Sequence, residues 1–282
     1  IVFLPTELTL DRIFRSHSDL YAIVNNYIDD INIVYKRFST NLGSVDLIQQ
    51  WERCIDMVQD ESWIWLFSDD DIMDKNCVKS FFETINFNHN YELYRFNINI
   101  IDDKNDVINL EGNTKISGTL DTYSFFKKRI SGVLNSFVVE FVFNKIKFYE
   151  AGRFQNFDLA WGSDLATWIK ISDQKGFFNI ENASISWRSS DVNISPNVTP
   201  KMVLRKVYAT VDFFHWVIGF FKSRGDNVMF LCFLSMFKRL KLFSPYLAKT
   251  DINAVIYKFC SPFPFSKVLA MFLRLGLSLF VR

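Results

Sequence analysis

The chain has 282 residues, enough to bury the core of one large domain with or without a smaller appendage. Hydrophobic residues make up 49% of it, but charged residues make up 22% and no apolar run has the length of a membrane span, which argues against an integral membrane protein. The net charge is only +1, although 13 Lys and Arg face 3 Asp and Glu from Lys201 onward. This basic tail indicates either a helical subdomain or attraction to an anionic membrane surface, and no nucleic-acid partner is expected.

The cysteines bear on the redox compartment of the protein, and the first residue bears on its N-terminus. The four cysteines lie far apart and form no CxxC motif, so we interpret them as reduced core thiols of a cytoplasmic protein: Cys54, Cys77, Cys232 and Cys260. The sequence begins with Ile1 rather than Met, so we expect the natural N-terminus to lie upstream.

Strands and helices are predicted to alternate over the first 190 residues. In chain order we expect a strand at 31–36, a helix at 45–58, a strand at 63–67, a helix at 75–85 capped by Asp74, a strand at 91–101, a helix from a Thr119 cap to about 130, a helix at 163–174, and strands at 177–180 and 184–187. The continuous apolar run at 63–67 is typical of a parallel strand buried on both faces. The order predicts an α/β/α sandwich around a mostly parallel sheet, over residues 1–195.

Only helices are predicted beyond a linker that contains Pro196 and Pro200. They are expected at 201–221, 227–242, 252–259 and 266–280, and form a helical extension over residues 196–282. The last of them is amphipathic, with a narrow polar stripe of Lys267, Arg274, Ser278 and Arg282. It is too short to span a bilayer comfortably, so it either lies in a membrane interface or packs on the body or on a second subunit.

Three adjacent aspartates, Asp69, Asp70 and Asp71, follow Ser68 at the end of the apolar strand. Residues just past the carboxyl end of a buried strand stand where open α/β sheets bind ligands. Adjacent carboxylates repel one another, and a divalent cation such as Mg²⁺ or Mn²⁺ relieves that repulsion and can bridge a diphosphate. The alternative is a solvated acidic turn.

The acidic run also matches a second motif. Residues 70–74 and 102–106 both spell DDxxD, the aspartate-rich motif of isoprenyl diphosphate synthases. Those enzymes carry the motif on helices of an all-α bundle, whereas here one copy follows a strand and the other lies in a predicted turn. This alternative therefore requires a different fold from the one predicted above.

The segment from Ile31 to Asp71 resembles family 2 glycosyltransferases, which have the GT-A fold. The shared order is a strand, an Asn-Leu-Gly turn, a helix, an apolar strand and an acidic motif. Asn41 and Gly43 match the turn and are assigned to the nucleotide-sugar site by this resemblance. It also implies that Asp70 is the main metal ligand, assisted by Asp69 or Asp71, while Ser68 stands where the family often has Asp.

Two later blocks extend the resemblance to about residue 195. Trp161-Gly-Ser-Asp164 is similar to the family's segment in which an aspartate at the start of a helix is the general base, with Ser163 where Glu is frequent. A carboxylate there is favoured by the helix dipole and can accept a proton, although Asp164 is also a plausible helix cap. Arg188 matches the family's arginine segment and is assigned to the diphosphate, with a solvated surface arginine as the alternative.

The resemblance implies a bacterial, metal-dependent and inverting glycosyltransferase. Its donor is expected to be a nucleotide-diphosphate sugar, and its acceptor a glycan or lipid-linked glycan. The basic tail adds an expected peripheral contact with the inner face of the cell membrane. The family's first strand is not visible upstream of residue 21, so we expect it to be missing. A non-catalytic membrane-associated protein on a degenerate transferase fold remains the rival to an enzyme.

Overall fold

The structure is a computed structural model that describes residues 2–4, 34, 36, 38–43, 45–108, 114–189 and 194–278. Of the strand expected at 31–36 only two residues are described, and Arg282 of the predicted polar stripe lies outside the described residues. The α/β part contains β1 (Val2–Leu4), α2 (Leu47–Ile55), β2 (Trp63–Ser68), β3 (Ile72–Met73), α3 (Cys77–Phe87), β4 (Leu93–Ile101), β5 (Gly118–Leu120), α4 (Thr122–Ser131), β6 (Phe141–Asn144), α5 (Lys145–Glu150), α6 (Ser163–Ile171) and β7 (Phe177–Arg188). The helices that follow are α7 (Pro200–Lys222), α8 (Met229–Phe243), α9 (Lys249–Cys260) and α10 (Ser266–Ser278).

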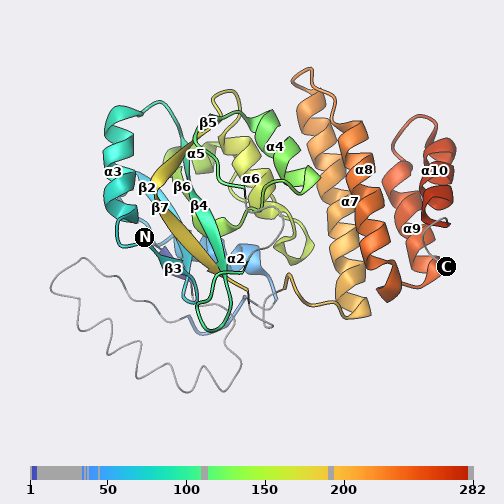
Figure 1. The fold of residues 1–282 in the computed structure, drawn as a ribbon, viewed down its shortest axis with the longest axis horizontal. Coiled ribbons are helices and arrows are strands. Elements are labelled where there is room, and N and C mark those ends of the chain that lie inside the picture. Colours follow the sequence, from blue (N-terminus) through green and yellow to red (C-terminus); the bar gives the residue numbers. More distant parts are fainter. Residues whose placement is uncertain are drawn as a thin grey trace.

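The described strands form one sheet in the order β1-β2-β6-β4-β7-β3, with β5 also paired to β7 (Figure 1). β1 runs parallel to β2, and β4 runs parallel to β7. β6 is antiparallel to both of its neighbours, β2 and β4, so these two strands point the same way. The predicted α/β fold is confirmed: β1, β2, β4 and β7 run in one direction, and β3, β5 and β6 run in the other. The carboxyl ends of β2, β4 and β7 lie along one edge.

Helices cover both faces of this sheet, and β2 shows how the sequence achieves it. Ile64 and Leu66 face a core shared with α2, α4 and α6, whereas Trp65 and Phe67 face a second core shared with α3. All four side chains are buried. An apolar run with this alternation fits a strand that is covered on both sides, as predicted.

The four C-terminal helices pack side by side at one end of the sandwich (Figure 1). Their buried side chains belong to the same hydrophobic core as those of the α/β part: Val207 and Phe213 of α7, Leu240 of α8 and Leu273 of α10 join Trp168 of α6. α7 contacts α6, and α8 contacts α4. The boundary predicted at 195/196 stays a prediction, but one core extends across it. The four cysteines are buried and unpaired, as expected.

Two predicted helix starts are wrong by two residues each. α3 begins at Cys77 with Asn76 as its N-cap, and Asp74 instead accepts a hydrogen bond from the Asn76 amide at 2.9 Å. Thr119 lies in β5, and the cap of α4 is Asp121, whose Oδ1 accepts from the Ser124 amide at 2.8 Å. Asp121 caps α4 through its side chain, whereas the Asn76 side chain makes no capping hydrogen bond to α3.

The two short strands expected at 177–180 and 184–187 are one strand, β7. Its pairing with β4 shifts register so that Ile180 opposes Phe96 while Ser184 opposes Asn97. Residues 181–183 therefore form an irregularity within one strand, whereas the sequence pattern predicted a break between two strands there. β6 and α5 were not predicted, because at four and six residues they are too short for a periodic signal.

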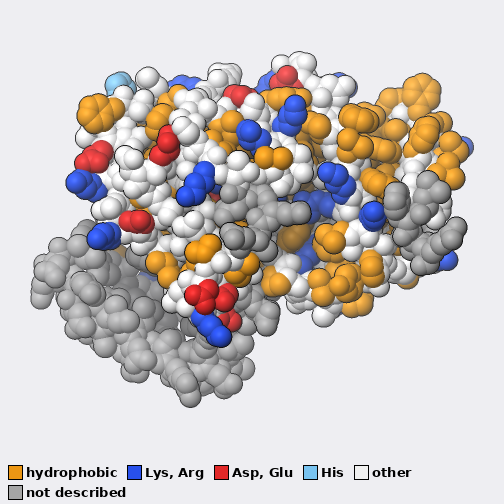
Figure 2. All heavy atoms as spheres, viewed as in Figure 1, with side chains coloured by type: hydrophobic (Ala, Val, Ile, Leu, Met, Phe, Trp, Pro, Cys, Tyr) orange, Lys and Arg blue, Asp and Glu red, His pale blue; other side chains and the backbone are white. Residues whose placement is uncertain are grey.

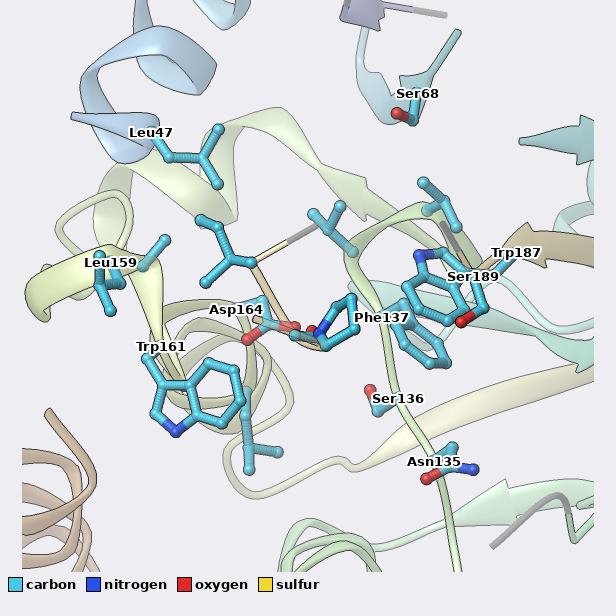
Figure 3. Close-up of a pocket in the computed structure, with 18 of the residues that line it drawn as sticks. Leu47, Ser68, Asn135, Ser136, Phe137, Leu159, Trp161, Asp164, Trp187 and Ser189 are labelled. Carbon is cyan, nitrogen blue, oxygen red and sulfur yellow. The ribbon is translucent and has the colours of Figure 1, made fainter. Parts of the chain in front are cut away.

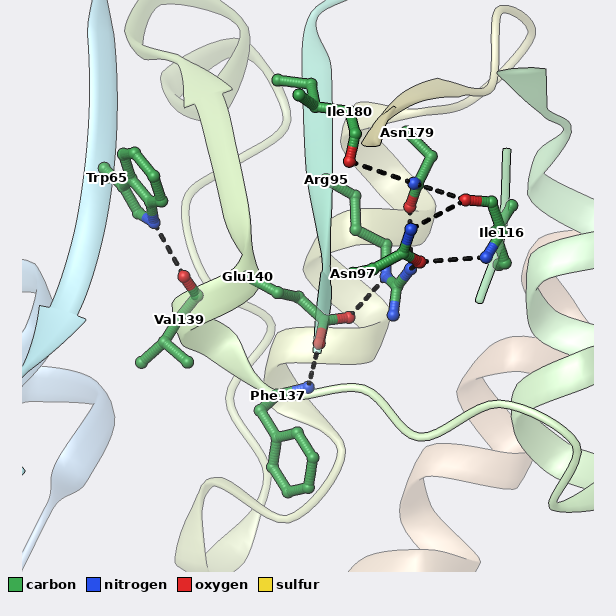
Figure 4. Close-up of polar contacts among 9 residues, drawn as sticks. All are labelled: Trp65, Arg95, Asn97, Ile116, Phe137, Val139, Glu140, Asn179 and Ile180. Atoms are coloured by element: carbon green, nitrogen blue, oxygen red, sulfur yellow. Dashed lines mark hydrogen bonds and ion pairs between the residues drawn. The ribbon is translucent and has the colours of Figure 1, made fainter. Parts of the chain in front are cut away.

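A buried ion pair joins β4 to the turn before β6 (Figure 4). Arg95 Nε donates to Glu140 Oε1 at 2.7 Å, and the two side chains are 2% and 0% exposed. Arg95 also donates to Asn179 on β7 at 2.8 Å, and Glu140 accepts from the Phe137 amide at 3.3 Å. Burial raises the pKa of Glu140 to about 7, and the charge of Arg95 offsets part of that effect.

We expect Arg95→Met to lower the free energy of unfolding by about 3–5 kcal/mol, because it leaves the Glu140 carboxylate buried without its counter-charge. The loss of free energy of unfolding caused by Arg95→Met should be smaller at pH 5 than at pH 8. A carboxyl whose pKa is raised in the folded state stays protonated there at low pH, and stability falls as the pH rises through that pKa.

Urea unfolding at the two pH values measures this effect. The control is Lys79→Met, which removes the exposed Lys79–Glu83 pair at 3.7 Å and should cost less than about 1 kcal/mol. Equal losses in the two variants would contradict a structural role for the buried pair.

Candidate active site

A cavity of about 620 Å³ opens where the carboxyl ends of β2 and β7 approach the start of α6. Figure 3 shows Asp164 in the middle of the labelled side chains, with Trp161 on one side and Phe137 and Trp187 on the other. The volume is in the range of cavities that hold nucleotide-sized ligands. Its lining includes residues from the acidic run, from α2, from α6 and from the C-terminal helices.

The acidic run follows β2 directly, and its members differ in position. Asp70 and Asp71 are half-buried and line the cavity together with Ser68, whereas Asp69 is exposed and does not line it. Ser68 Oγ donates to Asp70 Oδ1 at 2.8 Å, so this serine, which stands where the resemblance led us to expect Asp, orients the Asp70 carboxylate. Burial, with smaller contributions from the charges of Asp70 and Asp69, raises the pKa of Asp71 to about 7.

Arg188, at the end of β7, holds the acidic run in place. Its backbone amide donates to Asp71 Oδ1 and its Nε donates to the Asp70 carbonyl, both at 2.8 Å. The rest of the guanidinium donates to the Asp102 carbonyl at 2.5 Å and to Asn105 Oδ1 at 2.7 Å. The side chain thus connects three segments of the chain. Its assignment to the diphosphate stays a prediction, and these contacts give it a positioning role that the sequence did not reveal.

Aromatic side chains form two walls of the cavity. The rings of Phe137 and Trp187 stack with centroids 3.9 Å apart and planes 16° from parallel. On the opposite side, Trp161 Nε1 donates to Thr210 Oγ1 of α7 at 3.1 Å. Flat aromatic faces at the edge of a polar cavity are suited to packing against sugar rings and bases. Neither pair was predicted, because the partners are 50 or 49 residues apart in the sequence.

Asp164 lies in the first turn of α6, after Gly162 in the left-handed conformation at φ 89°. It is half-buried and lines the cavity. Burial raises the pKa of its carboxyl, while the Leu165 amide and the positive charge of Arg129 act in the opposite direction. Ser163 points away, since its Oγ accepts from the Phe157 amide at 3.0 Å and the residue is fully buried. Ser163, which stands where the resemblance led us to expect Glu, is therefore part of the local packing.

The two residues of the predicted turn, Asn41 and Gly43, differ in their position relative to the cavity. Gly43 lines the cavity, but Asn41 is exposed and lies outside its lining. Asn41 Oδ1 accepts from the Gly43 amide at 2.9 Å, which closes the turn just before α2. Their assignment to the nucleotide sugar stays a prediction.

Comparison with known proteins gives structural matches alone. No protein-family model matches the sequence, and no curated protein matches it. The crystal structure of the S. aureus TarS 1–349 fragment is similar to this chain with a TM-score of 0.51 and 9% identity, over 98% of this chain and 80% of that one. The same fragment in complex with UDP-GlcNAc gives a TM-score of 0.53 and 10% identity, over 98% and 81%. TarS is a family 2 glycosyltransferase. The fold is that of a glycosyltransferase.

This fold contradicts the isoprenyl diphosphate synthase alternative. Residues 70–74 follow β2 in a bend and enter the two-residue strand β3, and residues 102–106 form a turn in which Asp102 Oδ1 accepts from two backbone amides. Neither DDxxD copy lies on a helix, so the two cannot face each other across a helical bundle.

The donor atoms in the cavity are compatible with a hard divalent cation. Among the described residues, no three His, Cys, Asp or Glu side chains come together as a metal site. The acidic run offers two cavity-lining carboxylates, those of Asp70 and Asp71. Mg²⁺ is commonly held by one or two carboxylates together with substrate phosphates and water. The donor set therefore fits a cation that binds with a diphosphate.

We expect Arg188→Ala to loosen the acidic run without unfolding the protein, because it removes the donors to the Asp70 and Asp102 carbonyls. Hydrogen exchange should speed up in residues 69–73 and 102–106, and the free energy of unfolding should fall by about 1–3 kcal/mol. Arg224→Ala is the control, since it removes a guanidinium paired with Asp173 away from the cavity. If exchange in both segments stays as slow as in the native protein, the positioning role is wrong.

Proposed function

We propose that this protein is a glycosyltransferase that moves a sugar from a nucleotide-diphosphate donor to a hydroxyl of a glycan or lipid-linked glycan. One observation carries the proposal. In a glycosyltransferase fold, the carboxylates of Asp70 and Asp71 share a single cavity with Asp164, although they lie more than 90 residues apart in the sequence. The donor class is supported by the similarity to TarS, whose fragment was crystallised with UDP-GlcNAc.

Asp164 is the proposed general base of an inverting reaction. The acceptor oxygen attacks the anomeric carbon from the face opposite the leaving group, its proton passes to the Asp164 carboxylate, and the bond from the anomeric carbon to the phosphate oxygen breaks. The nucleoside diphosphate leaves with that bonding pair. The half-buried position of Asp164 favours proton acceptance, because burial raises the pKa of its carboxyl above the ordinary value.

Asp70 and Asp71 are the proposed ligands of Mg²⁺ or Mn²⁺, which when bound stabilises negative charge on the departing diphosphate. Asp69 is left out of this set because it is exposed outside the cavity. Ser68 fixes the orientation of Asp70 through its hydrogen bond, and Arg188 fixes the backbone of the same loop. These two residues keep the carboxylates in place before the donor arrives.

We expect Asp164→Asn to lower the rate of sugar transfer by about 10²–10⁴-fold while leaving donor binding intact, because the amide cannot accept the proton. Nucleotide release from a panel of nucleotide sugars with Mn²⁺ and candidate acceptors measures the rate. Calorimetry with the nucleoside diphosphate measures binding.

Asp70→Asn is the contrasting variant, in which metal-dependent donor binding itself should be lost. Asp226→Asn, at an exposed residue that does not line the cavity, is the matched control. If Asp164→Asn transferred sugar at the full rate, Asp164 would not be the general base. If the native protein bound no nucleotide under any of these conditions, the alternative of a non-catalytic protein on a transferase fold would be favoured.

We also propose that α10 contacts the anionic inner face of the cell membrane. The helix buries Ala270, Leu273 and Leu277 against the rest of the extension and leaves a second apolar stripe exposed: Val268, Met271, Phe272 and Leu275. Exposed Lys267 and Arg274 flank this stripe. Figure 2 shows hydrophobic side chains gathered over this end of the molecule. None of the described helices, including the 23-residue α7, combines the length and apolarity of a membrane span.

We expect Phe272→Glu to weaken binding to vesicles that contain anionic lipid by at least about tenfold, because it removes a large apolar side chain from the contact and adds a repelled charge. Vesicle sedimentation at low and high salt measures the affinity. Phe87→Glu on α3, where Phe87 is 83% exposed, is the matched control. Equal effects of the two substitutions would exclude α10 as the membrane contact.

A further inference from the structure

Two arginines line the cavity at the contact between the α/β body and the helical extension. Arg129 is in the last turn of α4, and Arg239 is on α8. The helices α4 and α8 contact each other, and both arginines are half-buried. The extension therefore contributes a charged side chain to the same cavity that holds Asp164.

Other buried or half-buried arginines have partners within the protein. Arg95 and Arg153 each pair with a carboxylate, and Arg188 donates to two backbone carbonyls. Within the part of the chain that the structure describes, no hydrogen bond or ion pair reaches the guanidinium of Arg129 or of Arg239. Two like charges held near each other in half-buried positions are costly unless an anion joins them.

Electrostatic effects agree with this geometry. Burial, together with the neighbouring charge of Arg129, lowers the pKa of Arg239 to about 10. Arg239 therefore remains charged at neutral pH. A pair of guanidinium groups without carboxylate partners is suited to a phosphate or carboxylate, which accepts several hydrogen bonds in the plane of each guanidinium.

The pair belongs to the Asp164 end of the cavity. The charge of Arg129 lowers the pKa of the Asp164 carboxyl. The pKa of Asp71 is instead affected by the charges of Arg188, Asp70 and Asp69. If the donor diphosphate lies with the acidic run and its cation, the arginines lie where the group next to the reacting hydroxyl would be.

We propose that Arg129 and Arg239 form a subsite for an anionic group, a phosphate or a carboxylate, that the acceptor carries beside the hydroxyl deprotonated by Asp164. The subsite rests on the proposed function for its place in the reaction, but anion binding at these two arginines is testable without turnover. It makes the acceptor an anionic glycan and makes α8 part of the acceptor site.

The test uses three sugars that share a ring and differ in charge: glucose 6-phosphate, glucuronate and glucose. Calorimetry with the full chain, with UDP and Mn²⁺ present at saturation, measures their affinities. We expect the native protein to bind at least one anionic sugar about ten- to hundredfold more tightly than glucose, and Arg129→Met or Arg239→Met to remove that preference. Which anionic sugar is preferred identifies the group.

Lys238→Met is the matched control, because Lys238 is on the same helix, is exposed and does not line the cavity. It should change the affinities less than about twofold, since exposed charges contribute little. Removal of either arginine should also leave the urea midpoint unchanged or raise it, because one of two like charges is lost. A lower midpoint with unchanged sugar affinity indicates a structural role and overturns the proposal.

Two further outcomes overturn it. Equal affinity of the native protein for all three sugars excludes an anion subsite. Loss of UDP affinity in the arginine variants, with the sugar preference retained, assigns the pair to the donor instead. Failure of the proposed function is a separate result, since the protein would then bind the anionic sugar but transfer no sugar from any donor.

Discussion

The buried pair of Arg95 and Glu140 is the constraint on which the cavity depends. Placing two charges in the interior is costly, and the structure offsets that cost by using each charge for further hydrogen bonds. Arg95 ties β4 to Asn179 on β7, and Glu140 ties the turn before β6 to the amide of Phe137. Phe137 then stacks on Trp187, so a wall of the cavity is fixed from inside the sheet. The ion pair thereby links the positions of β4 and β7 in the sheet to the position of one wall of the cavity.

A second set of contacts acts at the sheet edge, where three adjacent carboxylates repel one another. Arg188 comes from β7 but bonds to the loop after β2 and to the turn after β4. The carboxyl ends of three strands are therefore joined by one side chain. This arrangement holds Asp71 half-buried at a position where burial raises the pKa of its carboxyl. The loop is held by the protein's own contacts, so Asp70 and Asp71 are fixed in position at the edge of the cavity.

The sequence predicted these elements to different degrees for physical reasons. The apolar run at 63–67 identified β2 and its burial on both faces, because period and composition are local properties. Asp70, Asp71 and Asp164 were predicted as candidate site residues because they lie at the end of an apolar strand or at the start of a helix. Arg188 was found, but its contacts were not, because its partners lie more than 80 residues away. Arg129 and Arg239 carry no local signal at all, since an arginine on an amphipathic helix is ordinarily a solvated one.

The helical extension matters to the site because its core is continuous with that of the α/β body. Lys206 of α7 is fully buried and donates to the carbonyls of Ser195 and Asn197, which holds the segment where the chain crosses from β7 to α7. That segment lines the cavity, as does Arg239 of α8. A basic tail that appeared in the sequence as a single electrostatic feature is thus divided by folding. Arg239 lines the cavity, whereas Lys267 and Arg274 on α10 are exposed beside an apolar stripe.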